Sequence, residues 1–367
     1  MEEAAERWDI FCRVVDNFGD AGVAWRLARN LAREHGKRVR LLLDDFAALA
    51  RLCPDLDAGA ERQSLHGVDI TRWSSGPFAP RDIADVVVET FGCDPPPAYV
   101  LAMAARTPRA RWINLEYLSA EDWIEGSHGL PSPDPRLPLV KHYFFPGFTP
   151  RTGGLLRESD LLARRDAFRA DAAAQSAFWR GLVGEVPPPD ALKLSLFAYP
   201  GAPVDDWVAA LAKSAAPVWL VAPGGTARAG AGNVRLFAVP FVAQDRYDEL
   251  LWACDVNVVR GEDSFVRAQW AARPFIWHIY PQDDGAHWVK LAAFLARYTA
   301  GLDRGAAAAL SSLWESWNRA QPMLASWGAF AARRGVLEAH ARAWCDRLAT
   351  RRDLAATLAD FADNVLK

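Results

Sequence analysis

The sequence has few of the residues that mark disulfide-linked, metal-centred or membrane-spanning proteins. Its five cysteines among 367 residues are scattered and include no Cys-x-x-Cys pair, which predicts reduced thiols and a cytoplasmic location. The seven histidines form no His-x-x-x-His motif or Cys/His cluster, so we expect no metal site. No apolar run approaches the roughly 18 residues that a membrane span needs, and the Glu- and Ala-rich start lacks a signal-peptide pattern.

A strong charge of either sign is also missing. Lys and Arg number 42 against 45 Asp and Glu, a formal net charge of −3, which argues against nucleic acid or an anionic membrane as a partner. The chain is 51% hydrophobic and 24% charged, which is typical of a globular protein and argues against disorder. The sixteen tryptophans are many, and we expect part of this aromatic surface to serve binding.

The common phosphate-binding and hydrolase motifs are absent as well. The sequence contains no G-x-G-x-x-G, P-loop or G-x-S-x-G, so it gives no dinucleotide, nucleoside-triphosphatase or serine-hydrolase signature.

What is present is an alternation of apolar strands and amphipathic helices. In the first half it predicts a helix over 21–35 and strands over 8–15, 38–43, 84–88 and 111–115. After a long helix over 158–182 and a three-proline linker at 184–190, the pattern restarts. It predicts further strands over 192–198, 218–221, 234–239, 256–259 and 274–279. Such alternation favours an α/β fold with two mainly parallel sheets facing a cleft, followed by a helical tail from residue 306.

The first candidate site is the turn between the first strand and the first helix, Asp16-Asn17-Phe18-Gly19-Asp20. Glycine permits the close approach of a substrate, and two carboxylates four residues apart suit a base or a receptor for a cation. An equally weighted alternative is that Asp20 only caps the helix, as Asp commonly does.

The second candidate site, Arg260-Gly261-Glu262-Asp263-Ser264, follows another predicted strand. Arg260 suits bidentate binding of a diphosphate, Ser264 and the adjacent N–H groups suit the same phosphates, and Glu262 and Asp263 suit sugar hydroxyls. The alternative is a charged turn with a helix cap.

Aromatic and amide side chains follow other strands of the second half. Phe197, Tyr199 and Phe241 can stack on a nucleobase, and Gln244 can bind its edge. Tyr280 follows the strand at 274–279 and is expected to reach the same ligand. For each phenylalanine taken singly, a place in the core is the commoner case.

These motifs resemble those of the bacterial elongation factor P arginine rhamnosyltransferases (EarP). Further matching segments span most of the chain: Glu89-Thr90-Phe91, Asn114-Leu115-Glu116-Tyr117, Gly153-Gly154-Leu155, Phe265-Val266-Arg267-Ala268-Gln269 and Trp277-His278-Ile279-Tyr280-Pro281-Gln282-Asp283.

The resemblance implies a GT-B glycosyltransferase with two Rossmann-like domains. It implies an acceptor domain at 1–183, with helix 349–367 packing back on it, and a nucleotide-sugar domain at 184–348. The implied reaction is metal-independent, inverting transfer of L-rhamnose from dTDP-β-L-rhamnose to an arginine of elongation factor P, which then rescues polyproline-stalled ribosomes.

The resemblance also implies roles for individual residues. Asp20 matches the general base, Asp16 and Glu262 match further catalytic acids, and the remaining residues match the substrate contacts: Asn17, Phe18, Gly19, Phe197, Tyr199, Phe241, Gln244, Arg260, Asp263, Ser264 and Tyr280. The alternative is a GT-B enzyme that uses another nucleotide sugar or a small acceptor. A binding protein that keeps the fold without activity is weighted lower, since both acidic motifs are present.

Overall fold

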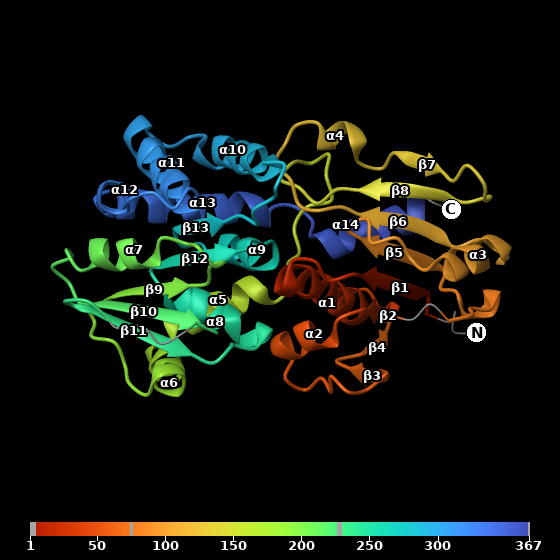
Figure 1. The fold of residues 1–367 in the computed structure, drawn as a ribbon, viewed down its shortest axis with the longest axis horizontal. Coiled ribbons are helices and arrows are strands. Elements are labelled where there is room, and N and C mark those ends of the chain that lie inside the picture. The colour runs from red at the N-terminus through yellow and green to blue at the C-terminus, as the bar shows by residue number, and fades with distance from the viewer. Residues whose placement is uncertain (1–4, 74–75, 226–229, 366–367) are drawn as a thin grey trace. The chain divides into compact units, whose positions relative to one another are not determined.

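The computed structural model of the chain describes residues 5–73, 76–225 and 230–365 (Figure 1). It divides into two compact units: Met1–Ser159 with Arg351–Lys367, and Asp160–Thr350. The division falls after Ser159, whereas the sequence placed it near residue 184. The reason is that residues 160–183 pack on the second sheet, where Phe178 and Trp179 share a core with Trp219 and Val221.

The first unit is built on an eight-stranded sheet with the order β3-β4-β2-β1-β5-β6-β8-β7. The inner strands are parallel, and the edge strands β3 and β7 are antiparallel to their neighbours. The strands are β1 Arg7–Cys12, β2 Arg38–Leu43, β3 Arg62–Leu65, β4 Val68–Arg72, β5 Val86–Thr90, β6 Arg111–Leu115, β7 Pro131–Pro133 and β8 Val140–Phe144.

The helical segments of the first unit are α1 Asn17–Glu34, α2 Phe46–Leu52, η1 Pro80–Asp82, α3 Pro97–Ala105, α4 Ile124–Ser127, α14 Leu354–Asp360 and η2 Phe361–Val365. Helix α1 packs on the sheet, and α2 packs on α1. On the face that carries Phe11 and Val87, the core is closed by Tyr99 and Met103 of α3. The last two elements, α14 and η2, come from the C-terminal end of the chain, and α14 packs against α1.

The second unit is built on five parallel strands with the order β11-β10-β9-β12-β13. The strands are β9 Leu192–Leu196, β10 Val218–Pro223, β11 Val234–Val239, β12 Val256–Arg260 and β13 Phe275–His278. The helices are α5 Leu161–Ala170, α6 Ala172–Val183, α7 Val204–Leu211, α8 Gln244–Ala253, α9 Asp263–Trp270, α10 Ala286–Thr299, α11 Arg304–Asn318, α12 Leu324–Ala331 and α13 Arg334–Ala349. The predicted α/β architecture and helical C-terminal region are therefore confirmed.

Two predicted helices differ from those observed. The helix expected over 158–182 is broken at Asp171, whose carboxylate accepts hydrogen bonds from the N–H groups of Ala173 and Ala174 and so caps α6. The first helix begins at Asn17, four residues before the predicted start, because the carboxylate of Asp20 accepts N–H groups in the turn that precedes the helix.

Most tryptophans form core rather than binding surface. Thirteen of the sixteen are buried, so the expected aromatic binding surface does not account for their number. All five cysteines, each within the described part of the chain, are buried with free thiols. Among the described helices, none combines the length and apolar character that crossing a bilayer requires.

Candidate active site

Three connecting segments meet at one edge of the first sheet. Strands β1, β5 and β6 are parallel neighbours, so the segments that follow their carboxyl ends leave the sheet side by side. These segments carry the start of α1, then Phe91, then Tyr117. The strand order changes direction between β1 and β5, and such a switch point is where open α/β sheets bind ligands.

Asp20 is held in the first turn of α1 by its own backbone surroundings. Its carboxylate oxygen Oδ2 accepts hydrogen bonds from the N–H groups of Val15, at 2.9 Å, and Asp16, at 2.8 Å. The residue at the N-cap position is Asp16, so Asp20 is not the helix cap that the sequence left open. Only 2% of Asp20 is exposed.

Burial raises the pKa of the Asp20 carboxyl above its ordinary value. The two backbone hydrogen bonds and a hydrogen bond from the Tyr117 hydroxyl act in the opposite direction, and burial outweighs them. A carboxylate with a raised pKa binds a proton more readily than an ordinary aspartate, which is the property that a general base needs.

Asp16 lies over the same helical turn. A Cβ placed on Gly19 would come within 2.5 Å of Oδ2 of Asp16, so only glycine leaves room for that carboxylate. Phe18 and Gly19 are half-buried, whereas the side chain of Asn17 lies outside what the structure describes. The predicted residues 16–20 thus form one turn, with two carboxylates at the N-terminus of α1.

Tyr117 and Phe91 are site residues that the sequence analysis did not single out. Their rings stack with centroids 4.2 Å apart and an angle of 9° between planes. Phe91 has a φ of +60°, which is rare for an aromatic residue and often marks a functional position. Both residues lie in segments that resemble the EarP family, and this was the signal available in the sequence.

The second unit has its own switch point, between β9 and β12. Phe197 and Tyr199 follow β9, and Arg260 ends β12. The Arg260 guanidinium lies 4.2 Å from the Phe197 ring centroid and 4.7 Å from that of Tyr199. Its Nη1 donates a hydrogen bond to the Ala198 carbonyl at 3.0 Å. Two rings and a carbonyl therefore fix this cation at the carboxyl edge of the sheet.

The turn after Arg260 leads directly into α9. Its backbone is fixed by Ser264, whose hydroxyl donates to the Arg260 carbonyl and accepts from the Arg260 N–H. Gly261 has a φ of +64°, and its carbonyl accepts a 2.8 Å hydrogen bond from Nε1 of Trp277. Glu262 is the N-cap residue of α9. This turn therefore presents the N-terminus of a helix, which favours anions.

Gln244 and Asp263 belong to a buried polar network. Nε2 of Gln244 donates to Oδ2 of Asp263 at 2.9 Å, and the same oxygen accepts from Nε of Arg267 at 2.8 Å. Nη1 of Arg267 in turn donates to Asp248 at 2.7 Å. These contacts tie the start of α8 to the start of α9, so they position the turn that carries Glu262.

Further aromatic side chains surround Arg260. Phe197 packs edge-to-face on Phe241 at 5.8 Å, and Tyr199 packs in the same way on Tyr280 at 5.5 Å. Tyr280 is 40% exposed, so it remains partly accessible to a ligand.

His278 forms a hydrogen bond with the backbone of Tyr199. Its Nδ1 accepts the Tyr199 N–H at 3.2 Å. Burial, with a smaller contribution from the Arg260 cation, lowers the pKa of His278 to about 4, so the ring is neutral near pH 7. A neutral histidine adds no charge beside Arg260.

The predicted site residues thus form two groups, one in each unit: residues 16–20 in the first, and Phe197, Tyr199, Phe241, Gln244, Arg260, Glu262, Asp263, Ser264 and Tyr280 in the second. Within the described residues, no group of three or more His, Cys, Asp or Glu side chains is arranged to hold a metal ion.

Relatives with known names match nearly the whole chain. A protein-arginine rhamnosyltransferase of Pseudomonas putida is 52% identical, over 98% of this chain and 99% of its own length. A protein of the same name from Pseudomonas aeruginosa is 45% identical, over 96% and 98%.

Solved structures agree with these matches. One, described as the structural basis for EarP-mediated arginine glycosylation of translation elongation factor EF-P, has a TM-score of 0.69 and 38% identity. The match covers 98% of this chain and 99% of that chain. A glycosyltransferase from Rickettsia africae ESF-5, with a TM-score of 0.55 and 10% identity over both full chains, shares the fold.

The architecture is GT-B, and the activity of these relatives is that of a protein-arginine rhamnosyltransferase. The family model described as Elongation-Factor P (EF-P) rhamnosyltransferase EarP matches residues 8–363. The chain therefore belongs to the EarP family of glycosyltransferases.

Proposed function

We propose that this enzyme transfers L-rhamnose from dTDP-β-L-rhamnose to an arginine of elongation factor P, with inversion and without a metal ion. The observation that carries the proposal is Asp20, a buried carboxylate with a raised pKa at the switch point of the first sheet. A positively charged acceptor is attracted to such a carboxylate, and the neighbouring Asp16 adds to the attraction.

The chemistry of arginine determines how Asp20 acts. A guanidinium has a pKa of about 13.8, whereas an aspartate titrates near roughly 4, so Asp20 does not deprotonate the acceptor in the ground state. Instead it orients one N–H and accepts that proton while the nitrogen bonds to C1 of the sugar. As this C–N bond forms, the bond from C1 to the diphosphate oxygen breaks, and dTDP departs with the electron pair. Attack opposite the leaving group inverts C1.

The second unit supplies the groups that the donor needs. Arg260 and the N-terminus of α9 stabilise the negative charge that develops on the departing diphosphate. Phe197, Tyr199 and Phe241 offer ring faces to the thymine, and Tyr280 lies beside them. Gln244 and Asp263 hold the turn from α8 to α9, while Glu262 faces the sugar hydroxyls.

The test is a transfer assay on purified elongation factor P with dTDP-β-L-rhamnose. We expect the acceptor to gain the mass of one deoxyhexose on a single arginine, and the gain to persist in the presence of a chelator. The control acceptor carries lysine in place of that arginine. Transfer from dTDP-glucose or UDP-glucose at the same rate, or modification of a free arginine but not of the protein, would support a different glycosyltransferase activity instead.

A further inference from the structure

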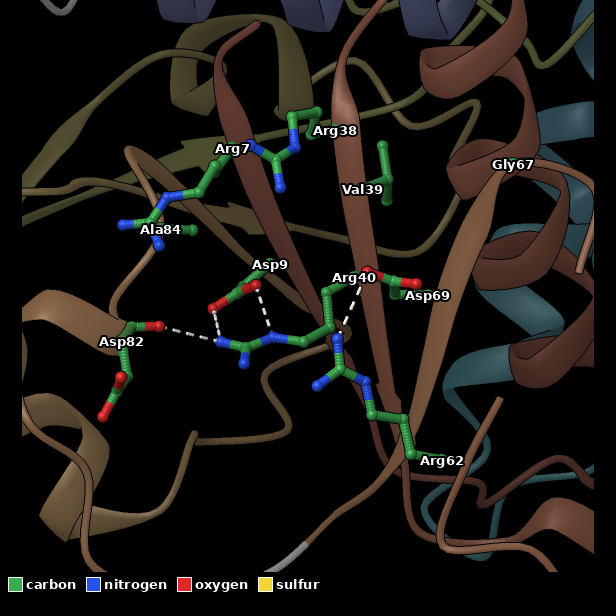
Figure 2. A pocket seen from close by; sticks show the side chains of 10 residues that line it. All are labelled: Arg7, Asp9, Arg38, Val39, Arg40, Arg62, Gly67, Asp69, Asp82 and Ala84. Carbon is green, nitrogen blue, oxygen red and sulfur yellow. Dashed lines mark hydrogen bonds and ion pairs between the residues drawn. The ribbon is translucent and has the colours of Figure 1, made fainter. Parts of the chain in front are cut away.

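A polar pocket lies in the first unit, away from the carboxyl edge of the sheet (Figure 2). It has a volume of about 240 Å³ and is lined by four arginines and three aspartates: Arg7, Arg38, Arg40, Arg62, Asp9, Asp69 and Asp82. Arg7 and Arg38 are the first residues of β1 and β2. The pocket therefore lies at the amino end of these strands, whereas Asp20 follows the carboxyl end.

The floor of the pocket is electrically balanced. In one row across the sheet, Arg40 on β2 pairs in register with Asp9 on β1 and with Asp69 on β4. The Arg40 guanidinium makes a two-pronged contact with Asp9, and Asp69 lies 3.5 Å from Arg62. Both carboxylates thus have a cationic partner (Figure 2).

The adjacent row is not balanced. Arg7 and Arg38 are register partners on neighbouring parallel strands, so two positive charges stand side by side and repel each other. The Arg7 guanidinium donates to the carbonyls of Arg81 and Ile83, which orient it without neutralising its charge. Arg38 makes no side-chain hydrogen bond, and neither arginine has a carboxylate within ion-pair distance in the described part of the chain.

We propose that this pocket binds a small phosphate anion between Arg7 and Arg38. Figure 2 shows the Arg38 side chain extending toward the start of β1, and the Arg7 side chain extending from β1 toward Ala84, with the Asp9–Arg40 pair below them. Carbonyls hold Arg7 in one orientation, so it loses little conformational freedom on binding. Guanidinium groups match the geometry of phosphate. The volume is below the roughly 300–1,000 Å³ of pockets for drug-sized ligands, which fits inorganic phosphate or the phosphate of a small monoester.

The test is calorimetric titration of the full chain with inorganic phosphate and with a hexose 1-phosphate, at constant ionic strength. Saturating dTDP is included so that the proposed donor site does not contribute. We expect saturable binding that Arg38→Gln and Arg7→Gln each weaken by about fivefold, the upper range for a solvent-exposed charge pair. Binding of both ligands identifies the phosphate group as the part recognised. Binding of inorganic phosphate alone restricts the site to the free anion.

The matched control is Arg51→Gln. Arg51 is exposed in the last turn of α2 and is absent from the pocket lining, so it carries the same charge change without the proposed contact. We expect phosphate affinity within twofold of the unchanged protein. Equal losses in Arg51→Gln and Arg38→Gln, or no saturable binding in the unchanged protein, would overturn the proposal. Circular dichroism establishes that each variant is folded.

Discussion

At the scale of single residues, Asp20 illustrates a conflict between stability and activity. Because burial raises its pKa in the folded state, folding favours the protonated form, and the ionised form lowers the free energy of unfolding. This destabilisation is absent below pH 3.8, the ordinary pKa of the Asp20 carboxyl, and it is complete above the raised pKa of the folded protein. A group needed in its ionised form thus destabilises the fold at the pH where it works.

We therefore predict opposite effects of Asp20→Asn on stability and on transfer. The amide oxygen still accepts the N–H groups of Val15 and Asp16, while the desolvated charge is removed. At pH 7.5 the free energy of unfolding should rise by on the order of 1 kcal/mol, and this gain should vanish near pH 3.5. Rhamnosyl transfer should be lost while dTDP binding is retained. A variant that is less stable at pH 7.5 contradicts the raised pKa of Asp20, and a variant that still transfers contradicts its assignment as base.

Arg260 allows a test of donor binding. Its planar guanidinium contacts the rings of Phe197 and Tyr199 as well as carrying a charge. Arg260→Ala should weaken dTDP binding by about 10- to 100-fold, the value of roughly 1.5–3 kcal/mol for hydrogen bonds to a charged group. Arg260→Lys keeps the charge but not the planar stacking, so we expect an intermediate loss. Calorimetry measures both, and Arg246→Ala, an exposed change in α8, is the control. Equal affinity in all four proteins would exclude Arg260 from the donor site.

At the scale of elements, the first turn of α1 depends on having no side chain at Gly19. In an ordinary helix, replacing glycine by alanine stabilises by about 1 kcal/mol. Here the added Cβ would meet Oδ2 of Asp16 at 2.5 Å, so Gly19→Ala should displace that carboxylate. We predict at least a roughly tenfold loss of transfer in a variant whose helix content is unchanged.

Gly181→Ala is the matched control for this prediction. Gly181 lies inside α6, and an added Cβ there would have no atom within 4 Å. We expect the usual gain in stability and unchanged transfer rates. If both variants behave alike, the close approach between Gly19 and Asp16 has no functional role.

The elements also show what the sequence could predict. The predicted strands over 38–43, 111–115 and 234–239 coincide with β2, β6 and β11. Apolar residues make up most of each run, and this signal is strong enough to reveal a strand although arginines occur in each run. Four strands of the first unit were missed: β3, β4, β7 and β8. They are part-exposed and carry polar residues or prolines, so they lack a continuous apolar run.

The residues of the candidate site also differ in whether local sequence reveals them. Residues 16–20 and 260–264 lie in strand-to-helix turns that sequence patterns reveal. Phe91 and Tyr117 lie on the side of α1 because β5 pairs with β1 and β6 pairs with β5. The order of strands in a sheet cannot be predicted from local sequence. The role of Asp263 within a buried network with Arg267 likewise depends on contacts across elements.

At the scale of the whole molecule, the chain ends by returning to the unit where it began. The N–H of Leu354 donates to the Leu155 carbonyl at 3.0 Å, and the Thr357 hydroxyl donates to the Gly153 carbonyl. Asp363 lies 3.0 Å from Nζ of Lys37. The fold of the first unit, including the helix that carries Asp20, therefore depends on residues more than three hundred positions away.

Because of this dependence, we predict that a destabilising substitution in α14 impairs rhamnosyl transfer but not dTDP binding. Leu354 is 2% exposed, and Leu354→Ala should lower the free energy of unfolding of the first unit by about 2–5 kcal/mol. Transfer should then fail at a lower temperature, while dTDP binding, which the proposed function assigns to the second unit, should be unchanged.

Leu324→Ala is the control, because Leu324 is 58% exposed in α12 and should change stability by less than about 0.5 kcal/mol. Scanning calorimetry with and without dTDP distinguishes the units, since the ligand should raise only the transition of the second. A parallel loss of dTDP affinity in Leu354→Ala would mean that the first unit also contributes to donor binding.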